Sequence, residues 1–142
     1  MPVSKSQAVW EGNLPEGKGK MTVGNNAYTG NYSFKSRFEE GEGTNPEELI
    51  GAAHAGCYSM ALSHLIAENG FTPIKVDTSA NVKLEKKGDG FEITQIELHT
   101  KVKAGGLSED KFMEFANGAK EGCSVSKALK AVDIKLNAKL EK

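Results

Sequence analysis

The chain has 142 residues, of which 38% are hydrophobic and 26% charged, and its formal net charge is −1 at pH 7. This length suits one domain with a real core, and the near-neutral charge gives no electrostatic reason to expect nucleic acid or an acidic surface as partner. We therefore predict a single domain over residues 1–142. The sequence shows no apolar signal region and no targeting tail, so we expect a cytoplasmic location.

The first part of the chain, residues 6–37, predicts short strands. Apolar and aromatic residues alternate with polar ones, and clusters of glycine and asparagine separate the runs. The last strand is expected to carry Phe34 and to end at Arg37. A loop rich in glycine and acidic residues follows over residues 38–44.

A long helix is predicted to follow this loop. Asn45 can cap its start, Pro46 suits the first helical position, and acidic residues occupy the first turn. Asn69 and Gly70 supply a left-handed stop.

Between its two ends this helix has apolar residues on nearly every side. Between Glu48 and Glu68 no residue carries an obligatory charge at neutral pH, so the helix should be covered on every side. The run contains two His, two Ser and two Gly, which argues against a membrane span and against a membrane partner. One layer of strands and two short helices leave part of such a helix uncovered. Burial of the remainder against a second copy predicts a homodimer.

The second half of the chain predicts one sheet and two further helices. Period-two alternation over residues 76–84 and 91–102 indicates two long strands joined by a turn, with a bulge between Ile93 and Ile96. Ser108 is expected to cap a helix that ends at Gly122, and a short helix over residues 124–130 precedes a last strand over residues 132–140. The pattern predicts an α+β fold with about six strands.

Cys57, in the middle of the long helix, is the residue with the most reactive chemistry. A thiol acts as a nucleophile only as thiolate, and Cys57 lies too far from the helix start for the dipole to stabilise that charge. A cation must therefore come from elsewhere. Arg37 is the only arginine in the chain, and lysine does not replace its planar fork. Arg37 is interpreted as holding the thiolate and orienting a peroxide; the alternative is a surface arginine.

Glu47 is a candidate to orient Arg37, since a bidentate carboxylate fixes the guanidinium plane. The alternative is that it serves only the helix N-terminus. Ten helical residues, about 15 Å, separate Glu47 from Cys57. Either Arg37 spans that gap, or the glutamate beside Cys57 belongs to a partner subunit.

Two further residues have open interpretations. Cys123, at the start of the short helix, has the setting of a partly exposed thiol with an ordinary or lowered pKa. It is either a resolving thiol for a Cys57 sulfenic acid or one of two unrelated buried cysteines. His54 is either a base or hydrogen-bond partner near Cys57 or a satisfied core residue. The two cysteines lack zinc-type spacing, and neither a metal nor a bound cofactor is expected.

Two segments carry a family resemblance: TNPEELIGAAHAGCYSMALS, residues 44–63, and EGCSVSKALKA, residues 121–131. Together with their spacing they resemble the osmotically inducible protein C (OsmC) family, which includes the organic hydroperoxide resistance proteins. The resemblance implies an OsmC-like fold: a long central helix packed on antiparallel sheets in an intertwined homodimer, with active sites at the subunit interface.

The resemblance also implies a thiol-dependent peroxidase for organic hydroperoxides, active in oxidative and osmotic stress. Cys57 would attack the peroxide, Cys123 would resolve the sulfenic acid as a disulfide, and Arg37 and Glu47 would assist. An external dithiol, such as a lipoyl group, would be the reductant. An apolar wall near Cys57, including Met60, would favour alkyl hydroperoxides.

One position departs from the family pattern. Proline is common after the second cysteine, where this chain has Ser124. Proline would pre-set the helix start, so the departure bears on the mobility of the Cys123 loop and on disulfide closure. A competing hypothesis is a non-catalytic stress protein that binds a hydrophobic ligand at the dimer interface, with both thiols inert.

Overall fold

A computed structural model describes residues 1–141. Its contacts divide the chain into two compact units, Met1–Leu49 and Ile50–Lys142. Between residues 1 and 141 it has six strands, in two three-stranded sheets, and four helices. The prediction of an α+β fold with about six strands is confirmed.

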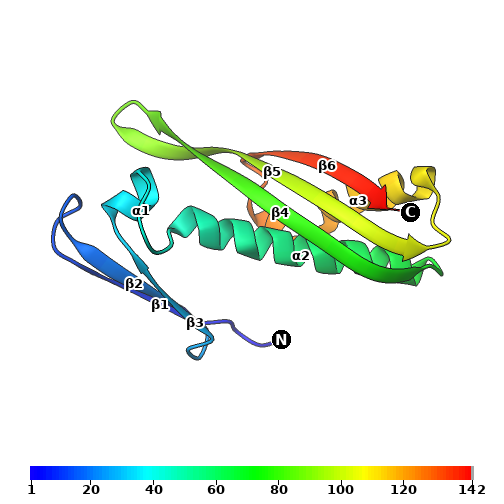
Figure 1. Cartoon of the computed structure of the whole chain (residues 1–142), viewed down its shortest axis with the longest axis horizontal. Helices are drawn as coiled ribbons and strands as arrows, with labels where there is room; N and C mark the ends of the chain where they lie inside the picture. The colour runs from blue at the N-terminus through cyan, green and yellow to red at the C-terminus, as the bar shows by residue number, and fades with distance from the viewer. Residues whose placement is uncertain (142) are drawn as a thin grey trace. The chain divides into compact units, whose positions relative to one another are not determined.

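The first unit contains an antiparallel meander. Strands β1 (Ser6–Glu11), β2 (Lys18–Val23) and β3 (Tyr28–Tyr32) pair in that order, shown in blue in Figure 1. Gly24 and Asn26 both have positive φ in the turn between β2 and β3, which explains the glycine and asparagine there.

The prediction that a strand carries Phe34 to Arg37 is wrong. These residues form a short helix, α1 (Phe34–Phe38), because Ser33 caps it in a box with Ser36: each side chain bonds the other's backbone N–H. The rings of Phe34 and Phe38, one turn apart, contact each other with centroids separated by 4.9 Å. The alternation of aromatic residues continues beyond the end of β3, but the capping box at Ser33 makes the following residues helical.

The long helix is confirmed as α2 (Pro46–Glu68). Asn45 accepts the Glu48 backbone N–H through its side-chain oxygen at 2.8 Å, as a cap should. Gly70 ends the helix with a φ of 89°.

In the second unit, α2 lies along one face of the sheet β4–β5–β6 (Figure 1). Strands β4 (Thr72–Lys87) and β5 (Gly90–Gly105) form a long antiparallel hairpin. The predicted bulge is confirmed: Lys83 faces Gln95 while Leu84 faces Ile93, which leaves Thr94 as the extra residue.

The last strand, β6 (Asp133–Glu141), pairs with β5 in parallel. This differs from the antiparallel sheets expected. The connection from β5 runs through α3 (Glu109–Gly122) and α4 (Ser124–Ala128), and a helical crossover of this kind returns a strand in the same direction. Ser108 caps α3 by accepting the Lys111 N–H, as predicted.

The hydrophobic core lies entirely in the second unit. Among residues 1–141, every buried hydrophobic side chain belongs to residues 58–140. Tyr58, Leu62 and Ile66, one turn apart on α2, are fully buried against β5 and α3. Residues 1–49 bury only polar side chains and glycines, so the first unit has little apolar core of its own.

The other face of α2 is exposed within the chain, contrary to the expectation that the helix is covered on every side. We call it the open face of α2. It consists mostly of small or apolar residues: Ala52, Ala53, Gly56, Met60, His64 and Ala67. By length and composition alone α2 is long and apolar enough to cross a membrane, as are many core helices of soluble proteins.

Candidate active site

The structure brings the two cysteines together in the second unit. Cys57, on α2, and Cys123, 66 residues later, have their Sγ atoms 2.8 Å apart, with Cys123 as the donor. Both are free thiols. The two cysteines are therefore in contact in the fold, which the sequence alone left open.

Cys123 occupies the junction between α3 and α4. Its backbone N–H bonds the Ala119 carbonyl at the end of α3, and its carbonyl accepts the Lys127 N–H at the start of α4. Its backbone is extended (φ −60°, ψ 128°), so the chain turns at this residue and directs the thiol inward. Cys123 is only 1% exposed, so the expectation of a partly exposed thiol is wrong.

The two thiols have opposite pKa shifts. Burial raises the pKa of Cys57, but hydrogen bonds from the Cys123 and Ser124 side chains and from the Val125 and Ser124 backbones outweigh it, so the pKa is lowered. For Cys123, burial and the bond it donates to Cys57 raise the pKa; contacts with Val125 and Ser126 oppose this only partly. The expectation of an ordinary or lowered pKa at Cys123 is therefore wrong. Cys57 is the thiol that ionises first, and Cys123 is its hydrogen-bond donor.

Two serines of the α4 turn serve the two sulfurs separately. The Ser124 hydroxyl lies 3.4 Å from Cys57 Sγ, whereas the Ser126 side chain acts to lower the pKa of Cys123. Ser126 Oγ also lies 2.7 Å from His54 Nε2, and both residues are buried. Sequence reasoning did not find this pair, because 72 residues separate its members and no motif links them.

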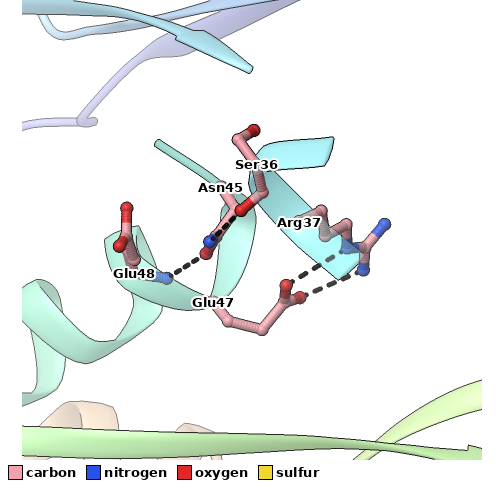
Figure 2. A network of polar contacts seen from close by, with 5 residues as sticks. All are labelled: Ser36, Arg37, Asn45, Glu47 and Glu48. Atoms are coloured by element: carbon pink, nitrogen blue, oxygen red, sulfur yellow. Dashed lines mark hydrogen bonds and ion pairs between the residues drawn. The ribbon is translucent and has the colours of Figure 1, made fainter. Parts of the chain in front are cut away.

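Arg37 and Glu47 form a bidentate ion pair within the first unit, shown in Figure 2. Arg37 donates from Nε to Glu47 Oε1 at 3.1 Å and from Nη2 to Oε2 at 3.0 Å. This is the fork geometry that the sequence suggested for orienting the guanidinium. The Glu47 side chain is 9% exposed and that of Arg37 is 34% exposed. Nη1 lies outside this pair.

A polar network holds this ion pair in place (Figure 2). Asn45 joins the two helices: its side chain donates to the Ser36 carbonyl of α1 and accepts the Glu48 N–H of α2. The Ser36 hydroxyl donates to the Thr44 carbonyl at 2.7 Å. These short hydrogen bonds connect α1, which carries Arg37, to the start of α2, which carries Glu47.

No group of three or more His, Cys, Asp or Glu that could hold a metal occurs among residues 1–141. The chemistry that the two cysteines offer is that of adjacent thiols, one with a lowered pKa and one with a raised pKa.

Comparison with known proteins places these features in context. The family model "OsmC-like protein" matches residues 39–137. The chain is 48% identical over 128 residues to "Peroxiredoxin OsmC" of Escherichia coli, covering 89% of this chain and 90% of that protein. It is 33% identical over 105 residues to "Organic hydroperoxide resistance protein OhrB" of Bacillus subtilis, covering 71% and 74%. The crystal structure of that OhrB matches with a TM-score of 0.72 and 27% identity, covering 95% of this chain and 98% of that one.

Proposed function

The chain belongs to the OsmC-like protein family, and from that premise we propose that it is a thiol-dependent peroxidase that reduces organic hydroperoxides through Cys57. Peroxidases of this kind need no prosthetic cofactor, since both electrons come from sulfur. The observation that carries the proposal is the contact between the two thiols, 2.8 Å apart, of which the more accessible one has the lowered pKa.

The reaction has three steps. The Cys57 thiolate attacks the distal peroxide oxygen of ROOH, the O–O bond breaks, and the alkoxide takes a proton to leave as ROH. Cys57 is now a sulfenic acid. The Cys123 thiol attacks that sulfur, forms the Cys57–Cys123 disulfide and releases water. An external dithiol then reduces the disulfide, regenerates both thiols and becomes a disulfide itself.

Arg37 and Glu47 complete the proposed catalytic set. In this proposal Glu47 fixes the guanidinium plane, and the positive charge of Arg37 stabilises the developing alkoxide. The proposal requires Arg37, of one subunit or the other, to reach the Cys57 of a site, as the ten-residue separation on α2 already indicated.

A homodimer is the proposed assembly. The open face of α2 is mostly small or apolar and is exposed within the chain. The first unit has little apolar core of its own. Contact with a second copy would bury apolar surface of both. A 49-residue unit with so little core is too small to be stable alone. We propose that each chain acts as a single functional domain in an intertwined dimer. The proposed location is the cytoplasm, where thiols stay reduced. The proposed role is the removal of peroxides that arise under oxidative or osmotic stress.

The proposed substrate is an alkyl hydroperoxide rather than hydrogen peroxide. Met60, on the turn of α2 after Cys57, is 76% exposed and is therefore free to line a site completed by a second subunit. An apolar lining contributes binding free energy only with an organic R group, at about 25 cal/mol per Å² of apolar surface buried.

The experiment is steady-state turnover of cumene hydroperoxide and of hydrogen peroxide with a dithiol donor, for the wild type and for Cys57→Ser. We expect faster turnover of cumene hydroperoxide and no turnover by the variant. Free thiols are counted after one equivalent of peroxide: the peroxidase loses both and keeps the mass of a single chain under denaturing conditions. A protein that retains both thiols is instead the non-catalytic ligand-binding protein, and the proposal fails.

A further inference from the structure

We propose that His54 and Ser126 form a buried hydrogen-bonded pair that positions Cys123 and stabilises its thiolate for the attack on oxidised Cys57. The inference rests on the proposed function and concerns its second step alone. Within residues 1–141 neither residue is among the hydrogen-bond partners of the peroxide-attacking sulfur, so both are positioning residues for the resolving thiol.

The pair connects α2 to α4 in the interior of the second unit. His54 Nε2 and Ser126 Oγ are 2.7 Å apart, and the residues are 0% and 4% exposed. Their hydrogen bond fixes the serine hydroxyl on the same short helix that Cys123 starts. Ser126 lies three residues after Cys123, in the first turn of α4, and its proximity acts to lower the pKa of that thiol. The result is a line of contacts from His54 through Ser126 and Cys123 to Cys57.

The direction of the protons follows from burial. Burial lowers the pKa of His54, so the ring is neutral and carries one N–H. Nδ1 is buried and has no hydrogen-bond partner within residues 1–141. A bare acceptor is tolerated in a protein interior more readily than a bare donor. The proton therefore resides on Nε2, which donates to Ser126 Oγ, and the serine hydroxyl is left to donate to Cys123 Sγ.

Two neighbouring titratable groups, Tyr58 and Cys57, do not compete for this proton. Tyr58, one turn after His54, donates its hydroxyl to the Ala116 carbonyl at 2.9 Å, and burial raises its pKa, so it stays neutral. Cys57 accepts rather than donates. Ser126 is therefore the side-chain donor directed at Cys123.

This donor matters in the resolving step. Cys123 attacks the sulfenic acid as a thiolate, yet burial and its bond to Cys57 raise its pKa. Once Cys57 is a sulfenic acid, its negative charge is gone and Cys123 no longer needs its proton to satisfy that sulfur. The serine hydroxyl, polarised by His54, then stabilises the new thiolate. The hydroxyl of the sulfenic acid leaves with the released proton as water, so the step balances.

The test separates the two chemical steps in single-turnover experiments. The first is followed by trapping the sulfenic acid with a dimedone-type reagent, and the second by the loss of the trappable species as the disulfide forms. Ser126→Ala is expected to slow the second step about tenfold near neutral pH, as for loss of one hydrogen bond to a charged group, and to leave the first within about twofold. His54→Leu is expected to act in the same way.

Conservative variants distinguish positioning from titration. Ser126→Thr keeps the hydroxyl and His54→Gln keeps an N–H near the Nε2 position, so both are expected to restore most of the rate. His99→Gln is the matched control, since His99 lies on β5 rather than on α2 or α4. A His54→Gln protein as slow as His54→Leu would contradict the neutral-donor role.

A second measurement stays informative if a variant turns over poorly. In a Cys57→Ser background Cys123 is the only thiol, and its pKa is read from thiolate absorbance; Ser126→Ala must raise it. An unchanged pKa together with an unchanged second step in folded variants overturns the inference, although the peroxidase proposal survives. A wild type that never forms a sulfenic acid removes the basis of both.

Discussion

The Ser124 hydroxyl lies 3.4 Å from Cys57 Sγ. Ser124 directly follows Cys123, the proposed resolving cysteine, where the family resemblance led us to expect proline, yet its hydroxyl contacts the other sulfur. Its backbone N–H also bonds Cys57 and lowers the pKa of that thiol. The departure therefore concerns the reactivity of Cys57 as well as the mobility of the Cys123 loop.

Substitution of Ser124 should have graded effects on the pKa of Cys57. Ser124→Ala removes the hydroxyl donor and is expected to raise this pKa, with a two- to fivefold slower first step near neutral pH, roughly the effect of one exposed hydrogen bond. Ser124→Pro removes the hydroxyl and the N–H together and should raise it further. Rates of sulfenic acid formation measured against pH check the order. Equal pH–rate profiles for the wild type and both variants would show that Ser124 does not affect the pKa of Cys57.

Cys123, the proposed resolving cysteine, should control the pH dependence of the first step. Cys123 donates to Cys57, which is one cause of the lowered pKa of Cys57. Cys123→Ala removes that donor, so the pKa of Cys57 rises and the thiolate fraction at a given pH falls. The rate of the first step, which increases as pH rises through the pKa, should therefore reach half its maximum at a higher pH in the variant.

The same variant gives an independent chemical result. Without Cys123 the sulfenic acid persists and is trapped in stoichiometric yield, while turnover with a dithiol donor is lost or becomes slow. Cys123→Ser is the matched control, since its hydroxyl can still donate to Cys57. If the half-maximal pH of Cys123→Ala equals that of the wild type, the thiol–thiol hydrogen bond does not tune Cys57.

The Arg37–Glu47 pair should act as one unit. Arg37→Lys keeps the charge but loses the two parallel hydrogen bonds to Glu47, so we expect the rate of sulfenic acid formation to fall by about two orders of magnitude, as for loss of an oriented charge at a reacting group. Glu47→Gln should give a smaller loss, because the amide keeps one acceptor. The double variant is expected to be no slower than Arg37→Lys alone. Additive losses in this double-mutant cycle would mean that the two residues act independently.

Most helices and strands could be predicted from the sequence, because the signals that define them are periodic and local. The caps of α2 and α3, the hairpin of β4 and β5 and the bulge after Ile93 all follow from residues close together in the chain. The helix at Phe34–Phe38 was missed because its signal is a pair of serines rather than a period. The parallel pairing of β6 was missed because alternation defines a strand but not its direction.

The contacts of Cys57 with Cys123 and of Arg37 with Glu47 occur in the structure, but their surroundings were not predicted. Residue types indicated both cysteines and the Arg37–Glu47 pair. The burial of Cys123, and with it the raised pKa, depends on packing between α2 and the turn from α3 to α4, which no local pattern encodes. The His54–Ser126 bond was missed for the same reason.

The last prediction concerns the open face of α2, which the proposed dimer covers. Met60 is 76% exposed within the chain, and a charged residue there would be desolvated in the interface at a cost of several kcal/mol. Met60→Lys is therefore expected to shift the protein from dimer toward monomer in sedimentation or light scattering at micromolar concentration. Met113→Lys, at an exposed methionine of α3 that is 40% exposed, is the control and should remain dimeric. If Met60→Lys keeps the dimer mass of the wild type, the open face is not the interface, and the proposal that a second copy covers α2 is wrong.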